Sequence, residues 1–244
     1  LMAVRERLYN DGASTWYAKD VGDAAAQRFI DETLAEHRPN DAVLSEEAAD
    51  DSNRLTADRV WIIDPLDGTQ EYSEFDRADW AVHIALWERK DADGKPSDEG
   101  SITEAAVALP AYNMTLSTHQ LPKTPDKHDG KPRLVVSRNR ATREAVIVAE
   151  ALDCDVARLG SAGAKAMAVV LGEVDIYVHA GGMYQWDSAA PIAVAAAAGL
   201  FTSRIDGTPL VYNRRDAWLP DLVVCQQHLA QQVIDALRAG RLGA

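Results

Sequence analysis

Cysteine is scarce in this sequence, with only Cys154 and Cys225 among 244 residues. Neither belongs to a C-x-x-C pair or stands at zinc-ligand spacing from a histidine, so a disulfide framework or a zinc site is not expected. Solitary cysteines usually behave as small buried hydrophobic residues. We therefore expect two reduced, buried thiols.

Long hydrophobic runs are also missing. No apolar segment approaches the roughly 20 residues that a helix needs to cross a bilayer. There is no signal-peptide pattern either, so we expect the cytoplasm as the location. Because the chain begins at Leu1 rather than at a methionine, we expect its native start to lie further upstream.

Basic residues are outnumbered, with 25 Lys and Arg against 38 Asp and Glu and a net charge of −13. A nucleic acid polymer or an anionic membrane would need a basic surface, so neither is expected as a partner. With 47% hydrophobic and 26% charged residues, the composition is that of an ordinary globular protein long enough to bury a sizeable core.

The hexapeptide Asp64–Thr69 (DPLDGT) is the most informative segment, and it follows the strand-like run Arg59–Ile63 (RVWII). Two carboxylates would leave the end of a buried strand, which Pro65 is expected to stop, and Gly68-Thr69 could open a helix. Mg²⁺ needs carboxylate oxygens, and a phosphate needs N–H donors close to that cation. A turn with Asx capping would explain an isolated match equally well.

Two further acidic segments favour a Mg²⁺ and phosphate site over a simple turn at Asp64–Thr69. Glu46-Glu47 follows Asp41–Leu44, a short apolar segment that could form a strand, although a solvated acidic loop is the alternative because more acidic residues follow. Trp186-Asp187-Ser188 precedes the helical run Ala189–Gly199, in which Asp187 or Ser188 is the expected N-cap and Gly199 the stop. Simple capping is the alternative for Asp187.

Taken together, Glu47, Asp64–Thr69 and Trp186-Asp187 resemble the signature of the inositol monophosphatase superfamily of Mg²⁺-dependent phosphatases. The resemblance runs from about Lys19 to Tyr212 and is finest to the CysQ-type branch, the bisphosphate nucleotidases that hydrolyse 3′-phosphoadenosine 5′-phosphate. The segments that resemble the actinobacterial members of that branch are Asp58–Trp87, Gly160–Val169 (GSAGAKAMAV), HAGGMYQWDSAAP around Asp187, and Asp206–Asn213 (DGTPLVYN).

The resemblance implies an α/β fold, the layered αβαβα sandwich of the inositol monophosphatase and fructose bisphosphatase type. It also implies one catalytic unit over residues 1–244, with an N-terminal metal-site lobe and a C-terminal nucleotide-contacting lobe that meet near residues 118–133, and a homodimer. The apolar spacing itself predicts a helix over Val21–His37. The other predicted elements are strands at Trp80–Trp87, Ile102–Leu109, Ala111–Ser117, Arg133–Ser137, Val174–His179 and Trp218–Cys225, and helices at Ala141–Leu152, Gly160–Gly172 and Leu229–Leu237.

The family pattern supplies the expected metal ligands. They are the side chains of Glu47, Asp64, Asp67 and Asp187 and the backbone carbonyl of Leu66. The resemblance implies about two or three Mg²⁺ ions per site. Asp64 would bridge two ions, with Glu47 on one side and Asp67 and Asp187 on the other.

Two residues are expected to activate water. The resemblance implies that Thr69 orients the nucleophilic water and that Asp23 accepts its proton. The family supplies this acid from a T-x-x-D segment, which matches Asp20-Val21-Gly22-Asp23 with Asp20 in place of the usual threonine. Capping of a first helical turn is the alternative role for Asp23.

Substrate contacts are expected from several segments. Gly68 and Thr69 would donate backbone N–H groups to the phosphate, with Asp187 beside it, and a second helix start at Gly160-Ser161 would meet the other face of the nucleotide. Gly160-Ser161 would in any case act as an ordinary cap.

Two cations are also expected at the substrate. Lys165 either extends to solvent or reaches a phosphate, and the resemblance favours the phosphate. Ser137-Arg138 resembles the segment with which bisphosphate nucleotidases hold the nucleotide, although a surface arginine is the alternative. The histidines His83, His119 and His179 have no mutual spacing typical of a metal site and are expected in the core or on the surface.

The expected activity is therefore that of a Mg²⁺-dependent, lithium-sensitive 3′(2′),5′-bisphosphate nucleotidase, which forms AMP and phosphate from a by-product of sulfate assimilation. Inositol 1-phosphate or fructose 1,6-bisphosphate are the alternative substrates, because substrate choice lies in loops outside the metal site. A catalytically silent cation-binding or regulatory protein is a different possibility. The intact Thr69 speaks against it, because cation binding alone does not require that residue.

Overall fold

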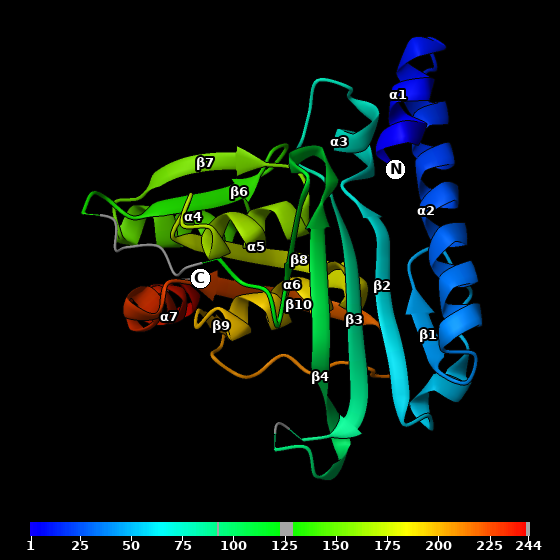
Figure 1. Ribbon diagram of the computed structural model, residues 1–244. Coiled ribbons are helices and arrows are strands. Elements are labelled where there is room, and N and C mark those ends of the chain that lie inside the picture. Colours follow the sequence, from blue (N-terminus) through cyan, green and yellow to red (C-terminus); the bar gives the residue numbers. More distant parts are fainter. Residues whose placement is uncertain (92, 123–128, 243–244) are drawn as a thin grey trace.

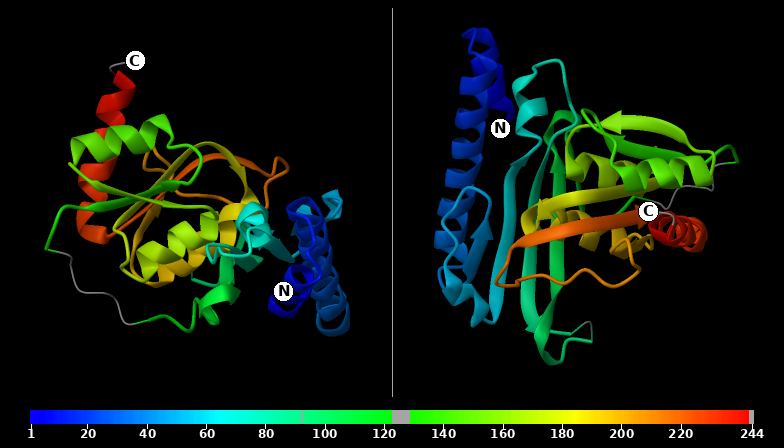
Figure 2. Two further views of the ribbon diagram at one scale, coloured as in Figure 1. Left: turned by 90° about the horizontal axis from the view of Figure 1, so that it is seen from above. Right: turned by 180° about the vertical axis from the view of Figure 1, so that it is seen from behind.

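The computed structural model describes residues 1–91, 93–122 and 129–242, and it shows a stack of alternating layers (Figures 1 and 2). Two five-stranded sheets each carry helices on the outer face, and two more helices fill the space between the sheets. The predicted αβαβα sandwich is therefore confirmed.

The first sheet has the order β1-β2-β3-β4-β5, with β1 parallel to β2 and the remaining neighbours antiparallel. Two helices, α1 (Met2–Asn10) and α2 (Thr15–His37), cover its outer face, drawn in blue in Figure 1. The strands are β1 (Ala42–Ser45), β2 (Arg59–Asp67), β3 (Ala81–Lys90), β4 (Pro96–Leu109) and β5 (Met114–Ser117).

The second sheet has the order β7-β6-β8-β10-β9. Its outer face is covered by α4 (Arg143–Ala151) and α7 (Ala230–Leu242), while α5 (Ala162–Val170) and α6 (Gln185–Ala197) lie between the sheets. The strands are β6 (Arg133–Ser137), β7 (Asp155–Leu159), β8 (Ile176–Tyr184), β9 (Phe201–Ser203) and β10 (Trp218–Cys225). Short helices complete the chain: α3 (Thr69–Ser73), and the 3₁₀ turns η1 (Ser52–Leu55), η2 (Pro110–Tyr112) and η3 (Gln227–Leu229).

Small side chains on the two middle helices let both sheets approach. Ala166 and Ala168 of α5 and Ala189, Ala190 and Ala195 of α6 are all buried in the central core. Because alanine loses little on entering a helix and takes little space, it suits a layer that must be covered on both faces.

Most predicted elements are present, but several boundaries differ. Pro65 does not end the strand, because β2 continues to Asp67 through a bulge between the pairs Asp64–His83 and Asp67–Ala81. A bulge leaves one residue outside the regular ladder, so the missing N–H of a proline is tolerated there. β5 begins only at Met114, because Pro110–Tyr112 forms a 3₁₀ turn.

Two helix starts were also placed too late. α2 begins at Thr15, so Asp23 lies in the helix interior and first-turn capping is not its role. α6 has Tyr184 as N-cap, and Asp187 is the third residue of the helix, from which its side chain accepts the N–H of Tyr184 in a capping box. The strands β7 and β9 were not predicted.

The remaining expectations have mixed outcomes. Both cysteines are free, but only Cys225 is buried and Cys154 is half-buried. None of the described helices is long and apolar enough to cross a membrane. The predicted lobe boundary falls partly on residues 123–128, which lie outside the described residues, and it stays a prediction.

Candidate active site

The bulge at the end of β2 delivers two buried carboxylates to one place. Asp64 pairs with His83 of β3, the chain then bulges over Pro65 and Leu66, and Asp67 ends the strand. Gly68 follows with φ +86° and serves as the N-cap of α3. A Cβ atom at Gly68 would lie 2.9 Å from Cβ of Ser161, so glycine is needed for the conformation and for this close approach.

One oxygen of Asp64 is left without a hydrogen bond. The Asp64 side chain is 1% exposed, and its Oδ1 accepts the backbone N–H of Leu66 at 3.0 Å, while Oδ2 has no hydrogen-bond partner and lies 4.0 Å from Nδ1 of His83. Burial, together with the charges of Asp67 and Glu46, raises the pKa of Asp64 well above its usual range. A buried, unpartnered carboxylate oxygen surrounded by other carboxylates is the kind of donor that a cation satisfies.

Asp67 is bonded to the start of α5. Its carboxylate accepts the Ser161 hydroxyl, the N–H of Gly163 at 2.6 Å and the N–H of Ala162 at 3.2 Å. Burial alone would raise the pKa of Asp67, but the neighbouring His83 and these hydrogen bonds outweigh it and lower the pKa to about 2. Asp67 is therefore the carboxylate of the group that remains ionised without a cation.

His83 belongs to this site, although no pattern in the sequence pointed to it. The ring is fully buried, with Nδ1 3.1 Å from the carbonyl oxygen of Trp186 and Nε2 3.1 Å from Oδ2 of Asp67. Since a carbonyl only accepts, Nδ1 must carry a hydrogen. Burial would lower the pKa of His83, but the nearby charge of Asp67 and the hydrogen bond to the Trp186 carbonyl raise it overall.

Within the described part of the chain, Asp64, Asp67 and His83 form the one group of three metal-ligating side chains whose ligand atoms all lie within 4.8 Å of one another. A lone histidine in an apolar strand is usually a core residue, so the sequence pattern pointed elsewhere. Only the register that sets Asp64 opposite His83 could have revealed its place.

Asp187 approaches from the other side. The backbone N–H of Tyr184 donates to its Oδ2 at 2.6 Å, which fixes the carboxylate at the start of α6. Burial and the charge of Asp67 raise the pKa of Asp187 to about 6. Asp187 therefore lies close enough to the two carboxylates of β2 to be repelled by them.

The two glutamates after β1 face different neighbours. The charge of Glu46 acts on Asp64, and partial enclosure with the charges of Asp187 and Glu47 raises the pKa of Glu46 to about 7, although its side chain remains exposed at one edge. Glu47 instead acts on Asp23 and lines a cavity of about 590 Å³ along α2. Of the two glutamates, it is therefore the charge of Glu46 that acts on Asp64.

Thr69 and Asp23 are brought together. The Thr69 hydroxyl donates to the carbonyl oxygen of Leu66 at 3.2 Å, and the Thr69 side chain also lies beside the Asp23 carboxylate and lowers its pKa. Burial and the charge of Glu47 raise the pKa of Asp23 to about 7, against the lowering effect of the Thr69 hydrogen bond. Asp23 can therefore take up and release a proton near neutral pH.

Lys165 does not extend to solvent. Its side chain is 2% exposed, its Nζ donates to the carbonyl oxygen of Gly160, and it lies 5.4 Å from the ring centre of Tyr177. Burial lowers the pKa of Lys165, although the charges of Asp67 and other carboxylates oppose this. The ammonium group lies beneath the start of α5, where Ser161 is the N-cap and accepts the N–H of Ala164 at 2.9 Å.

Arg138 is occupied by carboxylates of the α3 segment. It forms two hydrogen bonds to Glu74, at 2.5 and 2.9 Å, and its Nε lies 3.3 Å from Oε1 of Glu71. Nearby, the N–H of Gly160 donates to Asp79 at 2.7 Å. Ser137, Arg138 and Gly160 therefore gather where α3 meets the second sheet, rather than on a free basic loop.

The donor set fits a hard divalent cation. Asp64, Asp67, Asp187 and Glu46 supply carboxylate oxygens, and the raised pKa values of three of them express repulsion that a cation would relieve. The unpartnered Oδ2 of Asp64 is directly available as a ligand.

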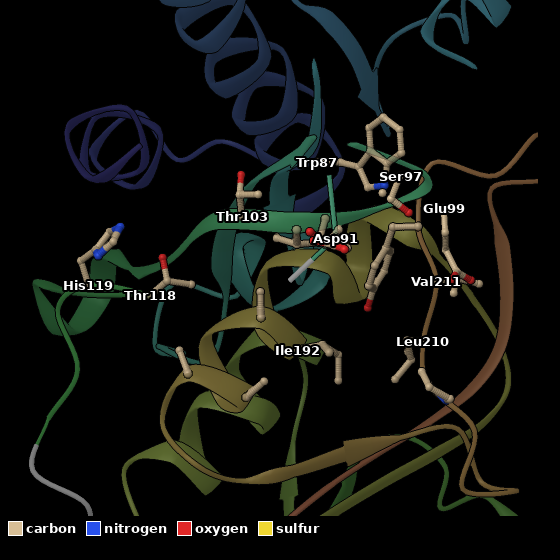
Figure 3. Close-up of a pocket in the computed structure, with 18 residues that line it drawn as sticks. Trp87, Asp91, Ser97, Glu99, Thr103, Thr118, His119, Ile192, Leu210 and Val211 are labelled. Atoms are coloured by element: carbon tan, nitrogen blue, oxygen red, sulfur yellow. The ribbon is translucent and has the colours of Figure 1, made fainter. Parts of the chain in front are cut away.

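A second cavity lies away from this chemistry. It measures about 900 Å³ and lies between the β3–β4 pair, α6 and the segment around Leu210 and Val211 (Figure 3). None of the carboxylates of the candidate site is among the residues that line it. Apolar side chains such as Ile192 form its floor, and Glu99 at its wall is paired with Arg214 at 3.2 Å.

Comparison with known proteins agrees with this geometry. The chain is 47% identical over 240 residues, or 97% of its length and 87% of the relative's, to a 3′-phosphoadenosine 5′-phosphate phosphatase of Mycobacterium bovis. It is 32% identical over 211 residues, 82% of this chain and 81% of the relative, to the 3′(2′),5′-bisphosphate nucleotidase CysQ of Escherichia coli.

Solved structures share the fold at lower identity. Inositol monophosphatase II of Staphylococcus aureus superposes with a TM-score of 0.75 at 19% identity, covering 96% of this chain and 87% of that one. Inositol monophosphatase of Anabaena gives 0.73 at 21% identity, covering 98% and 92%. Residues 19–240 match the inositol monophosphatase family. The chain therefore belongs to the inositol monophosphatase family.

Proposed function

We propose that this chain is a Mg²⁺-dependent phosphomonoesterase that converts 3′-phosphoadenosine 5′-phosphate and water to AMP and phosphate. The observation that carries the substrate is the 47% identity, over 97% of the chain, to mycobacterial enzymes of that name. The buried group of Asp64, Asp67 and His83, together with the charge of Asp187 that acts on Asp64, supports the metal-dependent chemistry.

The residues proposed to hold the cations are Asp64, Asp67, Asp187 and the carbonyl of Leu66. We propose Glu46, rather than Glu47, as the glutamate ligand, because the charge of Glu46 acts on Asp64 and that of Glu47 acts on Asp23. Two or three bound Mg²⁺ ions would neutralise phosphate oxygens and lower the pKa of a coordinated water.

Thr69 and Asp23 are proposed to manage the proton of the attacking water. Once the Thr69 hydroxyl turns from the Leu66 carbonyl to Asp23, its lone pairs can accept a hydrogen bond from the water and hold it in line. The water oxygen forms a bond to phosphorus as the bond from phosphorus to the 3′ oxygen breaks. The water proton passes toward Asp23, and the leaving 3′ oxygen takes a proton from solvent.

The remaining predicted contacts are proposed for substrate binding. The N–H groups of Gly68 and Thr69 would face the scissile phosphate, and Gly160-Ser161 the nucleotide. Lys165 would attract the substrate through its positive charge rather than by a direct hydrogen bond, because its ammonium group already donates to the carbonyl oxygen of Gly160. Arg138 would have to exchange Glu74 for a phosphate in order to bind the nucleotide, supported by Ser137.

Phosphate release from a panel of three substrates tests the proposal. The purified protein should hydrolyse 3′-phosphoadenosine 5′-phosphate at least tenfold faster, in kcat/KM, than inositol 1-phosphate or fructose 1,6-bisphosphate, and only with Mg²⁺ present. Preference for either other substrate would replace the nucleotidase assignment, and release of no phosphate from any would favour a silent cation-binding protein. LiCl should inhibit the reaction more than KCl at equal ionic strength. A homodimer and a cytoplasmic location are further proposals that rest on the family resemblance alone.

A further inference from the structure

An exposed aromatic residue stands next to the candidate active site. Tyr184 ends β8 and caps α6, and its side chain is 48% exposed. Its ring is stacked on Trp186, with ring centres 4.7 Å apart and planes inclined by 11°. One face of the Tyr184 ring is therefore covered by Trp186, and the exposed part of the side chain lies on the opposite face and the ring edge.

The position of Tyr184 relative to the carboxylates is fixed by its own backbone. Its N–H donates to Oδ2 of Asp187 at 2.6 Å, so the ring centre lies within about 10 Å of that carboxylate by standard bond lengths. In a nucleotide, the 3′ phosphorus and the base nitrogen are five bonds apart, roughly 6 Å. A substrate whose phosphate reaches Asp187 can therefore place its base over Tyr184.

The support of Tyr184 is also rigid. Trp186 is the residue before Asp187, and its carbonyl oxygen accepts a hydrogen bond from Nδ1 of the buried His83. The backbone that carries the stacked pair is thus tied to both β3 and the start of α6, and stacking on Trp186 restricts the Tyr184 ring before a ligand arrives.

We propose that Tyr184 is the residue on which the nucleobase of the substrate stacks, and that it distinguishes nucleotides from other phosphate esters. This inference rests on the proposed function and deepens it. Stacking of a base on an aromatic side chain corresponds to roughly tenfold to hundredfold in binding. Inositol phosphate and fructose bisphosphate carry no aromatic ring and gain nothing from this contact.

The test compares 3′-phosphoadenosine 5′-phosphate with ribose 3,5-bisphosphate, which has the same phosphates and sugar but no base. Tyr184→Ala should lower kcat/KM for the nucleotide roughly tenfold to hundredfold, mainly through KM, and change the value for ribose 3,5-bisphosphate less than about twofold. Tyr184→Phe, which keeps the ring, should restore the nucleotide value. Phe29→Ala, at an aromatic residue of α2 that is 70% exposed, serves as the control and should leave both substrates unaffected.

Other outcomes overturn the inference. An equal loss on both substrates would give Tyr184 only a structural role beside Asp187. No loss on the nucleotide would remove Tyr184 from the binding site, and a base-dependent loss in Trp218→Ala instead would assign stacking to its neighbour on β10, which is 46% exposed. If the wild-type protein does not hydrolyse the nucleotide at all, the proposed function and this inference both fail. Normal hydrolysis by Tyr184→Ala defeats the inference alone.

Discussion

At the scale of single residues, the charge balance around Asp64 matters most. The chain buries this carboxylate, leaves one of its oxygens unpartnered and surrounds it with Asp67, Asp187 and Glu46. Such an arrangement costs stability unless a cation is present. Residues that only maintained the fold would not need to be arranged in this way.

The first prediction is that Asp64→Asn abolishes phosphate release while the fold remains intact. An amide keeps the shape of the side chain but supplies no negative oxygen, so activity should fall at least roughly a hundredfold. The thermal midpoint measured in EDTA should rise, because one repelling charge has been removed. Phosphate release within tenfold of wild type would show that Asp64 is not a ligand.

At the scale of elements, α5 packs closely against β3 because residue 163 of the helix is a glycine and has no side chain. A Cβ atom at Gly163 would lie 2.0 Å from Nε2 of His83 and 3.0 Å from Cβ of Ala81. The helix therefore approaches the strand closely enough for its N–H groups to reach Asp67 only because residue 163 is glycine.

The second prediction follows from this contact. Gly163→Ala should destabilise the protein by about 1–3 kcal/mol through overpacking. The double variant with His83→Ala should be less destabilised than the sum of the two single variants, with a coupling of about 0.5–3 kcal/mol. Urea unfolding of the four proteins gives these values. Simple additivity would mean that the backbone shifts elsewhere and that the two residues do not oppose each other.

The helix α1 is attached to α3 by one buried arginine. Arg5 is 7% exposed and donates to the carbonyl oxygens of Tyr72 at 2.8 Å, Glu74 at 2.7 Å and Arg77 at 2.8 Å. These carbonyls belong to the segment that begins with Thr69. An N-terminal helix thereby stabilises the segment that carries the proposed water-orienting residue.

The third prediction is that Arg5→Ala lowers the free energy of unfolding by about 2–3 kcal/mol, because several buried carbonyls lose their donor. Amide hydrogen exchange in α3 should accelerate at the same time. Arg7→Ala, an exposed arginine of the same helix, is the matched control and should change stability by less than about 0.5 kcal/mol. Equal effects of the two substitutions would contradict a specific role for Arg5.

The layers and most elements could be predicted from the sequence, because apolar periodicity and the family resemblance report on long segments. Short strands such as β9 escaped, since three residues carry too little pattern. The choice between Glu46 and Glu47 stays a prediction, because adjacent residues differ only in the direction that β1 gives them. His83 was invisible for a related reason, as its partner Asp67 meets it only through the register of β2 and β3 and the bulge between them.

At the scale of the whole molecule, the raised pKa values predict how stability depends on pH. Burial and carboxylate repulsion raise the pKa of Asp23 and Glu46 to about 7 and that of Asp187 to about 6, above the roughly 4 of unfolded chains. The folded state then binds more protons than the unfolded state between these values. The contribution of these three carboxyl groups to folding stability is therefore fully present below about pH 4 and is lost as the pH rises through 6 to 7. Asp67, whose pKa is lowered to about 2, acts in the opposite sense and favours folding above about pH 4.

The fourth prediction is that the thermal midpoint in EDTA falls between pH 5 and pH 8. Mg²⁺ should reverse most of this loss at pH 8, because a ligand that binds only the folded state stabilises it. Differential scanning fluorimetry in EDTA and in MgCl₂ measures both, and Asp64→Asn should flatten the dependence in EDTA. A midpoint in EDTA that does not change with pH would mean that the carboxylates do not repel one another in the folded protein. A midpoint that does not respond to Mg²⁺ would mean that they do not bind the ion.

The contact between Asp67 and α5 has a consequence for the assembly of the layers. Asp67 ends a strand of the first sheet, while its donors Ser161, Ala162 and Gly163 begin a helix of the middle layer. An ion bound by Asp67 is thus linked to the docking of that helix, and linkage requires that each changes the equilibrium of the other by the same factor. The cation would then stabilise the packing of the layers as well as support catalysis. Removing it should release the amide hydrogen of Gly163 to exchange before any strand of either sheet opens.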